Sequence, residues 1–493
     1  MMSKRKLSIF EFETKNKNRY IFDNVTGLII PSSNEDKFII ENITMGEQYI
    51  LNNLVTRFFL DETIAKNKYN YIKTLVDNGY FYMSKEEKYL SVEECREMTL
   101  KSGVFQLILI ITESCNLRCK YCIYNEHYPY YRTYSNKNMN FEVAKRAIDL
   151  YFELYQKKKE NGLKRPPMIS FYGGEPLIGY KLIKEIVNYC KKFDYDVQFY
   201  ITTNGTLLNN DIIEFLVDNS FNIAISLDGN KANHNRNRVY IDGKGTFDTI
   251  VENIYLLDKI RKERGLRQPL TFICCYDDFT DMKNVIEFFE TLRKSIGDFN
   301  IVFNEVYRYD TTYYDYCKYS IKNDYKFYSL SNNAIKTLQE LQDVYIKAQE
   351  ENKEVSLTLK FLFQIFSLLK FRYQGFMGIL GNACAPGDKI AVDPEGNIFI
   401  CEKAVQKFDI GNVMEGIKWD KVQNIVNKFL EIRYENCADC NISRLCEVCY
   451  VHFMSSDNFR FNSGFCNDKK RRINKALSIL YSVLENNPYA FEY

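Results

Sequence analysis

The chain has 493 residues, of which 46% are hydrophobic and 26% are charged, and its formal net charge is +2. The length allows two to four domains of about 100–200 residues, and the nearly neutral charge argues against nucleic acid as a partner. The longest apolar run, GVFQLILIIT at residues 103–112, is too short to cross a membrane, and no signal-peptide pattern opens the chain. We therefore expect a cytoplasmic protein without a membrane partner, whose fifteen cysteines are metal ligands or free thiols rather than disulfides.

Residues 1–100 have the pattern of a small separate unit. The stretch NRYIFDNVTGLIIP at residues 18–31 predicts two short strands around a turn. The segments that follow carry apolar residues three and four positions apart, which is typical of helices, and the last of them ends at a glycine turn and a strand. This order is compatible with a winged-helix-like domain. The alternative is a packing extension of the next domain.

Residues 101–310 alternate short apolar runs with helical stretches. Runs with nearly continuous apolar character, joined by crossover helices, indicate a parallel sheet buried on both faces. Six such runs predict an α/β fold, a partial (β/α)6 TIM-like barrel, in which chemistry lies on the loops after the C-terminal ends of the strands. The six runs are VFQLILIIT, MISFYGGE, VQFYITTNG, FNIAISLDG, LTFICCYDD and FNIVFNEVYRYD.

Chemically unusual groups follow each of the first four runs. Turn chemistry explains some glycine, asparagine and aspartate at such positions. It does not explain a tandem glycine followed by a carboxylate at the same barrel mouth as three thiols. The groups are Cys115, Cys119 and Cys122 after the first run, GGEP at 173–176 after the second, TTNG at 202–205 after the third and SLDG at 226–229 after the fourth.

The remaining chain divides into two parts. Residues 311–383 are rich in tyrosine and have helical apolar spacing, so we expect a helical connector. Cysteines become frequent again from residue 384, and residues 384–493 are expected to form a third, Cys-rich domain. The three histidines, His127, His234 and His452, are scattered along the chain, so we expect no histidine-based metal site.

The loop TESCNLRCKYC carries the strongest chemical signal. Thiolates are the usual ligands of iron–sulfur clusters, and three of them would leave one iron of a 4Fe-4S cluster open. Zinc would need a fourth ligand, for which only His127 is near in sequence. Three free buried cysteines or a zinc knuckle are the alternatives. The spacing Cys115-x3-Cys119-x2-Cys122, with the aromatic Tyr121 before the last cysteine, resembles the radical S-adenosylmethionine (radical SAM) superfamily.

The resemblance implies a specific chemistry. The open iron would bind S-adenosyl-L-methionine, and the cluster held by these three catalytic cysteines would be reduced by a small donor such as flavodoxin or ferredoxin. Cleavage of the cofactor would give a 5′-deoxyadenosyl radical that abstracts a hydrogen from the substrate. The protein would orient the cofactor and exclude water.

The resemblance also implies which residues contact the cofactor near its methionine part. Gly173 and Gly174 would let the backbone approach the methionine moiety closely. Glu175 would accept hydrogen bonds from its ammonium group. Taken alone, Glu175 would be explained as an acid at a helix N-terminus.

Further contacts are implied on the next two loops. Ser226 matches a position that contacts polar groups of the cofactor, and Asn204 is a candidate contact to its ribose or carboxylate. Arg238 resembles an arginine that pairs with the carboxylate, with Arg236 as a competing assignment. We expect Tyr121 to belong to the same cofactor-binding set.

The C-terminal cysteines form a second group of ligand candidates. The run Cys-x2-Cys-x5-Cys-x2-Cys alone would suit a zinc ribbon, but seven thiols are too many for one four-cysteine site and one too few for two. Together with Gly396-x4-Cys401 they resemble the SPASM extension, which binds auxiliary iron–sulfur clusters. The family often has three residues before the fourth cysteine, and this chain has two. The seven are Cys384, Cys401, Cys437, Cys440, Cys446, Cys449 and Cys466.

The family pattern assigns these cysteines to two auxiliary clusters, and zinc in place of either one remains an alternative. Fully ligated relatives have another cysteine shortly before the first, and GFMGILGNAC offers none. One cluster would therefore keep an open iron that could bind a substrate thiolate or a non-cysteine ligand. The assigned ligands are Cys437, Cys440, Cys446 and Cys466 for one cluster and Cys384, Cys401 and Cys449 for the other.

The resemblance indicates a maturase of ribosomally made peptides. Residues 1–100 would bind the leader of a precursor peptide as an added strand. The enzyme would join a substrate carbon to a cysteine sulfur in a sactionine-type thioether. Anaerobic sulfatase maturation, carbon–carbon cross-linking and epimerisation are alternatives, and a metal-stabilised binding protein is the non-enzymatic one.

Overall fold

The computed structural model describes most of the chain. The described residues are 6–83, 88–102, 104, 106–160, 162, 165–266, 269–320, 379–456 and 458–488. Most of the predicted connector, residues 321–378, lies outside them. No helix among the described residues is long and apolar enough to cross a membrane.

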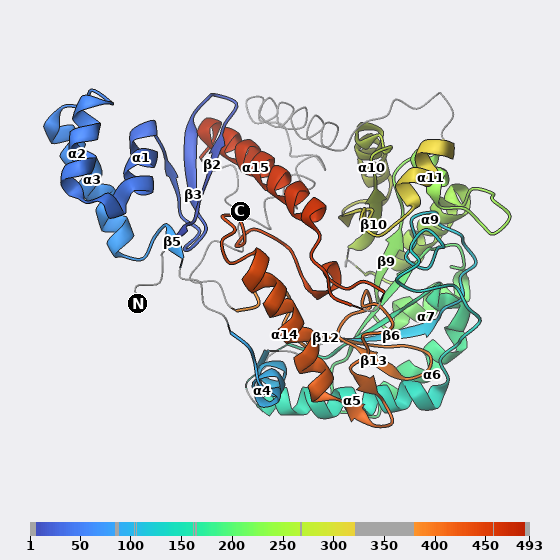
Figure 1. Cartoon of the computed structure of the whole chain (residues 1–493). Helices are drawn as coiled ribbons and strands as arrows, with labels where there is room; N and C mark the ends of the chain where they lie inside the picture. Colours follow the sequence, from blue (N-terminus) through green and yellow to red (C-terminus); the bar gives the residue numbers. More distant parts are fainter. Residues whose placement is uncertain are drawn as a thin grey trace.

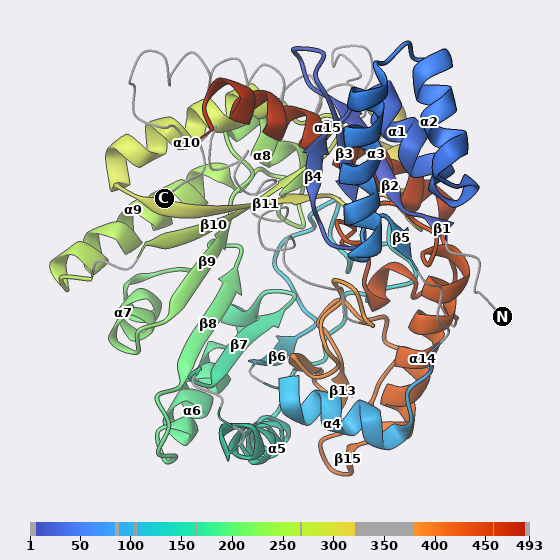
Figure 2. The ribbon, with the colours of Figure 1, turned by 90° about the vertical axis from the view of Figure 1, so that its left-hand side faces the viewer.

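Six parallel strands form the centre of the molecule, in the order β11-β10-β9-β8-β7-β6. Figure 2 shows them fanned side by side as an open barrel wall, with the helices on its outer face. The predicted partial barrel is therefore confirmed. The strands are β6 (Gln106–Thr112), β7 (Met168–Gly173), β8 (Gln198–Thr203), β9 (Asn222–Ser226), β10 (Leu270–Tyr276) and β11 (Phe299–Glu305).

Helices follow the strands as the apolar spacing predicts. Their buried faces are aliphatic, as in α6, where Ile183, Ile186 and Val187 pack into the main core. The helices are α5 (Phe141–Glu160), α6 (Tyr180–Cys190), α7 (Asn210–Asp218), α8 (Lys231–Asn237), α9 (Phe247–Glu263), α10 (Met282–Ile296) and α11 (Tyr313–Ser320), with the 3-10 turn η2 (Pro176–Gly179) after β7.

The C-terminal region extends the same sheet. Strand β12 (Lys389–Val392) pairs in parallel with β6, and β13 (Asn397–Phe399) pairs with β12 as a hairpin. Two short strands follow, β14 (Gly411–Asn412) and β15 (Gly416–Ile417). The hairpin is thereby placed beside the first barrel strand, although about 280 residues separate them in sequence.

Three further helical segments complete this region. They are α14 (Trp419–Asn436), the 3-10 turn η3 (Tyr450–His452) and α15 (Ser463–Asn486). Helix α4 (Val92–Ser102) packs against α14 and α5, so the segment just before β6 is attached to the barrel and the C-terminal region.

The N-terminal unit has its own core of aliphatic and aromatic side chains. Its antiparallel sheet consists of β2 (Ile9–Glu13), β3 (Arg19–Asp23) and β4 (Ile29–Pro31), in that order. Helices α1 (Asn34–Asn42), α2 (Glu47–Thr56) and α3 (Glu62–Asp77) follow, with η1 (Ile43–Met45) between the first two and the strand pair β1 (Lys6–Leu7) and β5 (Tyr82–Met83) closing the unit. In Figure 1 this unit projects from the barrel, and α15 runs alongside β2 and β3.

Local chemistry explains where these N-terminal helices begin. Ser33 and Asp36 form a reciprocal capping box at the start of α1, and the Asp61 carboxylate accepts hydrogen bonds from the backbone of Thr63 and Ile64 at the start of α3. Each such cap stabilises a helix by about 1 kcal/mol because it satisfies backbone donors that have no partner within the helix.

The pairing of β12 with β6 yields a prediction about stability. Ile390 lies in β12 and is fully buried. We expect Ile390→Ala to lower the free energy of unfolding by roughly 2–5 kcal/mol, because the cavity lies between the barrel and the C-terminal region. Met414 is 58% exposed, so Met414→Ala should change stability by less than about 0.5 kcal/mol. Anaerobic urea unfolding followed by circular dichroism measures both, and equal effects of the two variants would contradict the account.

Candidate active site

The three cysteines after β6 lie together on one loop at the barrel mouth. Cys119 is buried, and Cys115 and Cys122 are partly buried. Burial, with the charges of Glu175 and Cys122 acting in the same direction, raises the pKa of Cys115 to about 12. Burial raises the pKa of Cys119 as well, with the charges of Cys122 and Cys115 acting in the same direction against Arg238. The three sulfurs therefore interact electrostatically, as ligands of one centre would.

Each of these sulfurs has a nitrogen donor. The backbone N–H of Leu117 donates to Cys115 at 3.4 Å and that of Tyr124 donates to Cys122 at 3.5 Å. Arg238 Nη1 lies 3.9 Å from Cys119 Sγ. Such donors stabilise thiolates, and a coordinating metal deprotonates thiols whose pKa is otherwise high. The donor set fits a cluster held by three thiolates.

The zinc alternative fits this loop poorly. Among the described residues, no three His, Cys, Asp or Glu side chains converge closely enough to hold a single metal ion. His127 Nδ1 lies 3.1 Å from the Thr312 hydroxyl, and among the described residues this imidazole does not converge with the three cysteines on a single ion position. A four-iron cluster binds each thiolate through a different iron, so its ligands stand further apart than those of one zinc ion.

The tandem glycine is explained by contact with the cysteine loop itself. A Cβ on Gly173, whose φ is +137°, would lie 2.3 Å from the Thr112 carbonyl oxygen, and one on Gly174 would lie 2.1 Å from that of Ser114. The backbone N–H of Gly174 donates to Thr112 O at 2.8 Å, and that of Glu175 to Ser114 O at 2.9 Å. The two glycines therefore allow two neighbouring loops to pair, in addition to any approach to a cofactor.

Glu175 connects three parts of the barrel mouth. Its carboxylate accepts hydrogen bonds from the Thr203 hydroxyl at 2.7 Å, the Asn204 backbone at 2.7 Å and the Leu177 backbone at 3.1 Å. Burial raises the pKa of Glu175 to about 7, although these donors oppose the shift. The carboxylate thus joins the GGEP loop to the TTNG loop, and we still expect the same group to receive the cofactor ammonium.

Asn204 and Ser226 lie at the ends of the next two strands. Asn204 Nδ2 donates to Asn116 Oδ1 at 2.9 Å and approaches Cys115 Sγ at 3.9 Å, while its Oδ1 accepts from Thr206. Its side chain therefore supports the cysteine loop. Ser226 is buried at the end of β9.

The structure separates the two competing arginines. Arg236 makes a two-pronged ion pair with Asp277, at 2.8 and 2.6 Å. Arg238 instead donates to Asp228 at 3.0 Å and faces Cys119. Its guanidinium also lies over the Tyr121 ring, 5.4 Å from the centroid. Only Arg238 is thus placed beside the cysteine loop.

Asp228 is a residue of this site that the sequence did not single out beyond its place in SLDG. It accepts hydrogen bonds from Tyr121 Oη and from the backbone N–H of Cys275. In the sequence, an aspartate in a loop is weak evidence for a functional residue, because ordinary turns use aspartate as well.

Arg132 is a second residue that sequence reasoning missed. It is 1% exposed, and none of its three guanidinium nitrogens has a hydrogen-bond partner among the described residues. It lies 4.0 Å from Glu113 Oε1 and stacks over the Phe399 ring of β13 at 4.9 Å. Glu113 also accepts from Gln406 Nε2 at 3.0 Å. A buried cation thus joins the barrel mouth to the hairpin that precedes Cys401.

Four C-terminal cysteines come together at the junction of α14 and α15. Burial raises the pKa of Cys437 against the opposing charge of Arg433, and with the charges of Cys440, Cys466 and Cys446 the pKa reaches about 12. Cys437 lies at the C-terminal cap of α14, and Cys466 lies in the first turn of α15. This is the four-cysteine set that the sequence assigned to one auxiliary cluster.

The other three cysteines meet near Lys389. Burial lowers the pKa of Lys389, but the charges of Glu402, Cys401 and Cys384 outweigh it and give a net rise. Burial raises the pKa of Cys449, and the charge of Cys384 contributes to the rise. The set assigned to the second auxiliary cluster is therefore also brought together.

Two non-cysteine groups lie beside this trio. The Cys401 thiol donates to Glu402 Oε2 at 3.1 Å, and Cys449 Sγ lies 3.2 Å from His452 Nδ1. Burial lowers the pKa of His452 to about 4, so its imidazole is neutral. No pattern in the sequence selects His452, because its approach to Cys449 depends on the 3-10 turn η3, which the sequence did not predict. Both groups are candidates for the ligand that the missing cysteine would supply.

The tandem glycine provides a test. We expect Gly174→Ala to lose the cluster of the first loop, about four iron atoms per chain, and with it S-adenosylmethionine binding, since the new methyl group would displace Ser114 and the adjoining Cys115. Gly243 has φ +83°, and a Cβ added there would meet no atom within 4 Å, so Gly243→Ala should only add about 1 kcal/mol of backbone strain. Iron analysis and calorimetric titration measure both effects. A Gly174→Ala variant that kept the full iron content and bound S-adenosylmethionine would contradict the prediction.

The arginine pair provides a second test. Arg238→Lys keeps the charge but loses the planar fork, so we expect S-adenosylmethionine affinity to fall about tenfold or more. Arg236→Lys alters an ion pair directed away from the cysteine loop and should leave that affinity within about twofold, although it lowers stability. Calorimetric titration of both variants with S-adenosylmethionine decides which arginine binds the cofactor. A larger affinity loss for Arg236→Lys would reverse the assignment.

Comparisons with known proteins agree with this geometry. The model of the Radical SAM superfamily matches residues 109–292. A cysteine-type anaerobic sulfatase-maturating enzyme of Clostridium novyi is 33% identical over 32% of this chain and 42% of its own length. The radical SAM cyclopropyl synthase TigE of Paramaledivibacter caminithermalis is 22% identical over 80% of this chain and 75% of its own. The solved structure of native anSMEcpe with bound AdoMet has a TM-score of 0.54 at 21% identity, covering 77% of this chain and 99% of that one, and shares the fold.

The extent of these matches defines what they establish. Matches at 33% identity or more span about half of the length of the curated relatives. The Radical SAM superfamily model covers the part of the barrel that carries Cys115, Cys119 and Cys122. The cofactors of such a domain are S-adenosylmethionine and a 4Fe-4S cluster, which the three thiols and their donors fit. Residues 109–292 match the model of the Radical SAM superfamily, and this part of the chain is similar to a radical SAM domain.

Proposed function

We propose that this enzyme modifies a ribosomally made precursor peptide by joining a substrate carbon to a cysteine sulfur. The observation that carries the proposal is the three-cysteine set Cys384, Cys401 and Cys449, because the residues shortly before Cys384, GFMGILGNA, include no further cysteine. An auxiliary cluster held by three thiolates has an iron that can accept a substrate thiolate. The SPASM-type arrangement, with the four-cysteine set beside it, supports the same reaction.

The residues of the barrel mouth have defined tasks in such a reaction. When bound, the 4Fe-4S cluster and S-adenosylmethionine supply a 5′-deoxyadenosyl radical that abstracts hydrogen from the substrate. Arg238, held by Asp228, orients the cofactor carboxylate, and Glu175 receives its ammonium group. The buried contacts of Glu175 with Thr203 and Asn204 keep these groups fixed and exclude water.

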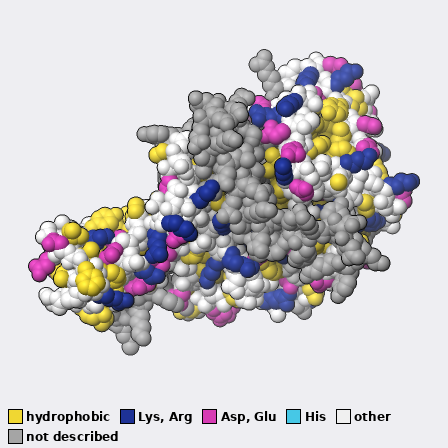
Figure 3. Space-filling view, turned by 90° about the horizontal axis from the view of Figure 1, so that it is seen from above, with side chains coloured by type: hydrophobic (Ala, Val, Ile, Leu, Met, Phe, Trp, Pro, Cys, Tyr) yellow, Lys and Arg dark blue, Asp and Glu magenta, His cyan; other side chains and the backbone are white. Residues whose placement is uncertain are grey.

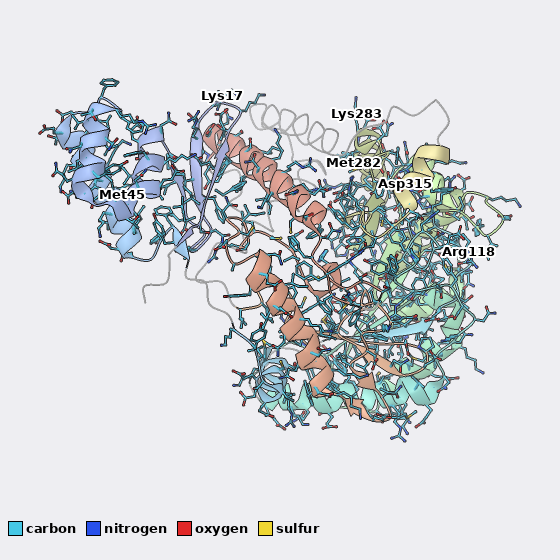
Figure 4. All side chains as sticks on the ribbon, in the orientation of Figure 1. Lys17, Met45, Arg118, Met282, Lys283 and Asp315 are labelled. Carbon is cyan, nitrogen blue, oxygen red and sulfur yellow. The ribbon has the colours of Figure 1, made fainter. Side chains whose placement is uncertain are left out.

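The N-terminal unit is proposed to bind the leader of the precursor. Strand β4 is one edge of its sheet, where an extended peptide can add as a further strand. Figure 3 shows apolar side chains gathered on this projecting lobe, and large exposed ones include Met45 and Phe59. Figure 4 places Met45 and Arg118, on the first cysteine loop, at opposite ends of the molecule. A bound leader would therefore act as a tether that raises the local concentration of the core peptide at the barrel mouth.

Anaerobic sulfatase maturation is the second candidate, supported by the Clostridium novyi relative and by the fold shared with anSMEcpe. In that reaction a Cys or Ser of a sulfatase becomes formylglycine. Carbon–carbon cross-linking and epimerisation of a peptide use the same hydrogen abstraction. For all of these reactions we propose a small electron donor such as flavodoxin or ferredoxin.

Intact-mass analysis distinguishes these reactions. The precursor peptide would be co-expressed anaerobically with the enzyme and treated with a thiol alkylator. In each thioether, the C–H hydrogen atom would pass to the 5′-deoxyadenosyl radical, the S–H proton to solvent and the remaining electron to the auxiliary cluster. We therefore expect the mass to fall by two hydrogens and one thiol to resist alkylation for each bond.

Two controls make the result specific. Co-expression with Cys115→Ala should leave the peptide unmodified, and a precursor without its leader should be modified at least about tenfold less, given millimolar effective concentrations for a tethered peptide. Loss of hydrogens with every thiol alkylated would instead indicate carbon–carbon cross-links. An unmodified peptide together with formylglycine in a co-expressed sulfatase would establish the second candidate.

A further inference from the structure

Hydrogen bonds connect the N-terminal unit directly to the loop between Cys440 and Cys446. Asn24 Nδ2 donates to Ser443 Oγ at 2.9 Å, and the backbone N–H of Arg444 donates to Asn24 Oδ1 at 2.9 Å. Arg444 Nε donates to the Asn24 carbonyl at 3.2 Å. The amide nitrogen and the amide oxygen of Asn24 therefore bind two consecutive residues of a five-residue loop.

The side chains that make this contact are buried. Asn24 is 1% exposed, and Ser443 and Arg444 are each 3% exposed. A third residue of the same loop, Asn441, donates to the Ile9 carbonyl at 2.9 Å. Buried polar groups of this kind are costly to leave without partners, at about 1–3 kcal/mol each, so the loop and the unit hold one another in place.

The same unit also holds the helix that carries Cys466. The backbone N–H of Lys15 donates to Ser482 Oγ of α15 at 2.9 Å, and Tyr20 Oη donates to Glu485 at 3.0 Å. The Tyr20 and Tyr481 rings pack with centroids 4.7 Å apart. Figure 1 shows this helix running along β2 and β3. The unit therefore contacts both the Cys440–Cys446 loop and the Cys466 helix, which together carry three of the four cysteines.

Such support matters because the described chain between α14 and α15 is mostly irregular, with η3 as its one helical turn. Fixing the backbone of an irregular residue costs about 1–2 kcal/mol, and an unsupported loop would incur that cost each time the site forms. A loop that is already held in place presents its thiols in a fixed geometry.

We propose that the N-terminal unit is a clamp for the four-cysteine site, with Asn24 as the positioning residue that holds the Cys440–Cys446 loop. The clamp rests on the proposed assignment of Cys437, Cys440, Cys446 and Cys466 to one cluster. It gives the unit a role in cofactor retention that is separate from leader binding. Deletion of the whole unit would therefore disturb the cluster as well as peptide recognition.

The test measures iron retention in the full-length reconstituted enzyme. Asn24→Ala removes the clamp, and we expect one cluster to release its iron to a ferrous chelator about tenfold faster or more, as loss of a buried hydrogen bond implies. Asn16 donates to Glu485 at 2.9 Å on the exposed part of the same interface, so Asn16→Ala is the matched control and should release iron like the wild type. Equal release from Asn24→Ala and wild type would overturn the clamp.

Two further variants separate a local effect from general unfolding and from a wrong ligand assignment. Ser443→Ala changes only the loop side, and the effects of Asn24→Ala and Ser443→Ala should be non-additive in the double variant; additive effects would contradict a direct contact. Cys440→Ala should lower the iron content by about four atoms per chain. If Cys440→Ala leaves the iron content unchanged, the assignment of the four cysteines to one cluster is wrong. That result would remove the four-cysteine cluster from the proposed function, whatever the Asn24→Ala variant shows.

Discussion

The pairing of two backbone segments at the mouth of the barrel is the constraint on which the site depends. The GGEP loop lies against the first cysteine loop so closely that a methyl group on Gly174 would overlap the Ser114 carbonyl. Two backbone hydrogen bonds, from Gly174 to Thr112 and from Glu175 to Ser114, fix this approach. The position of Cys115 follows from it, because Cys115 directly follows Ser114.

Each later strand adds one more support to the same loop. After β8, Asn204 reaches Asn116 and Cys115. After β9, Asp228 holds Arg238 beside Cys119. The C-terminal hairpin approaches from the other side, where Phe399 covers the Arg132 guanidinium. The first cysteine loop and the hairpin that precedes Cys401 are thus parts of one connected assembly.

The sequence predicts best what depends on local pattern. Strand β6 was predictable because both of its faces are buried, so its apolar run is nearly continuous. In β11, at the edge of the six parallel strands, exposed residues alternate with buried or half-buried ones, and its assignment rested on the regular alternation of strands and helices. The grouping of the ten candidate ligand cysteines into three sets rests on their spacing and a family resemblance, and it stays a prediction. Contacts between segments far apart in sequence were not predictable. The pairing of β12 with β6, the choice of Arg238 over Arg236, the place of His452 beside Cys449 and the bond between Asn24 and Arg444 all depend on tertiary packing.

The central claim is that one chain holds three iron–sulfur clusters at three separate sets of cysteines. Mössbauer spectroscopy with iron, sulfide and zinc analysis of the anaerobically reconstituted enzyme tests it most directly. The account predicts about twelve iron atoms per chain, all in 4Fe-4S clusters, with one iron of the first cluster changing its signal when S-adenosylmethionine is added. About four iron atoms accompanied by zinc would contradict it, because the C-terminal cysteines would then form zinc sites.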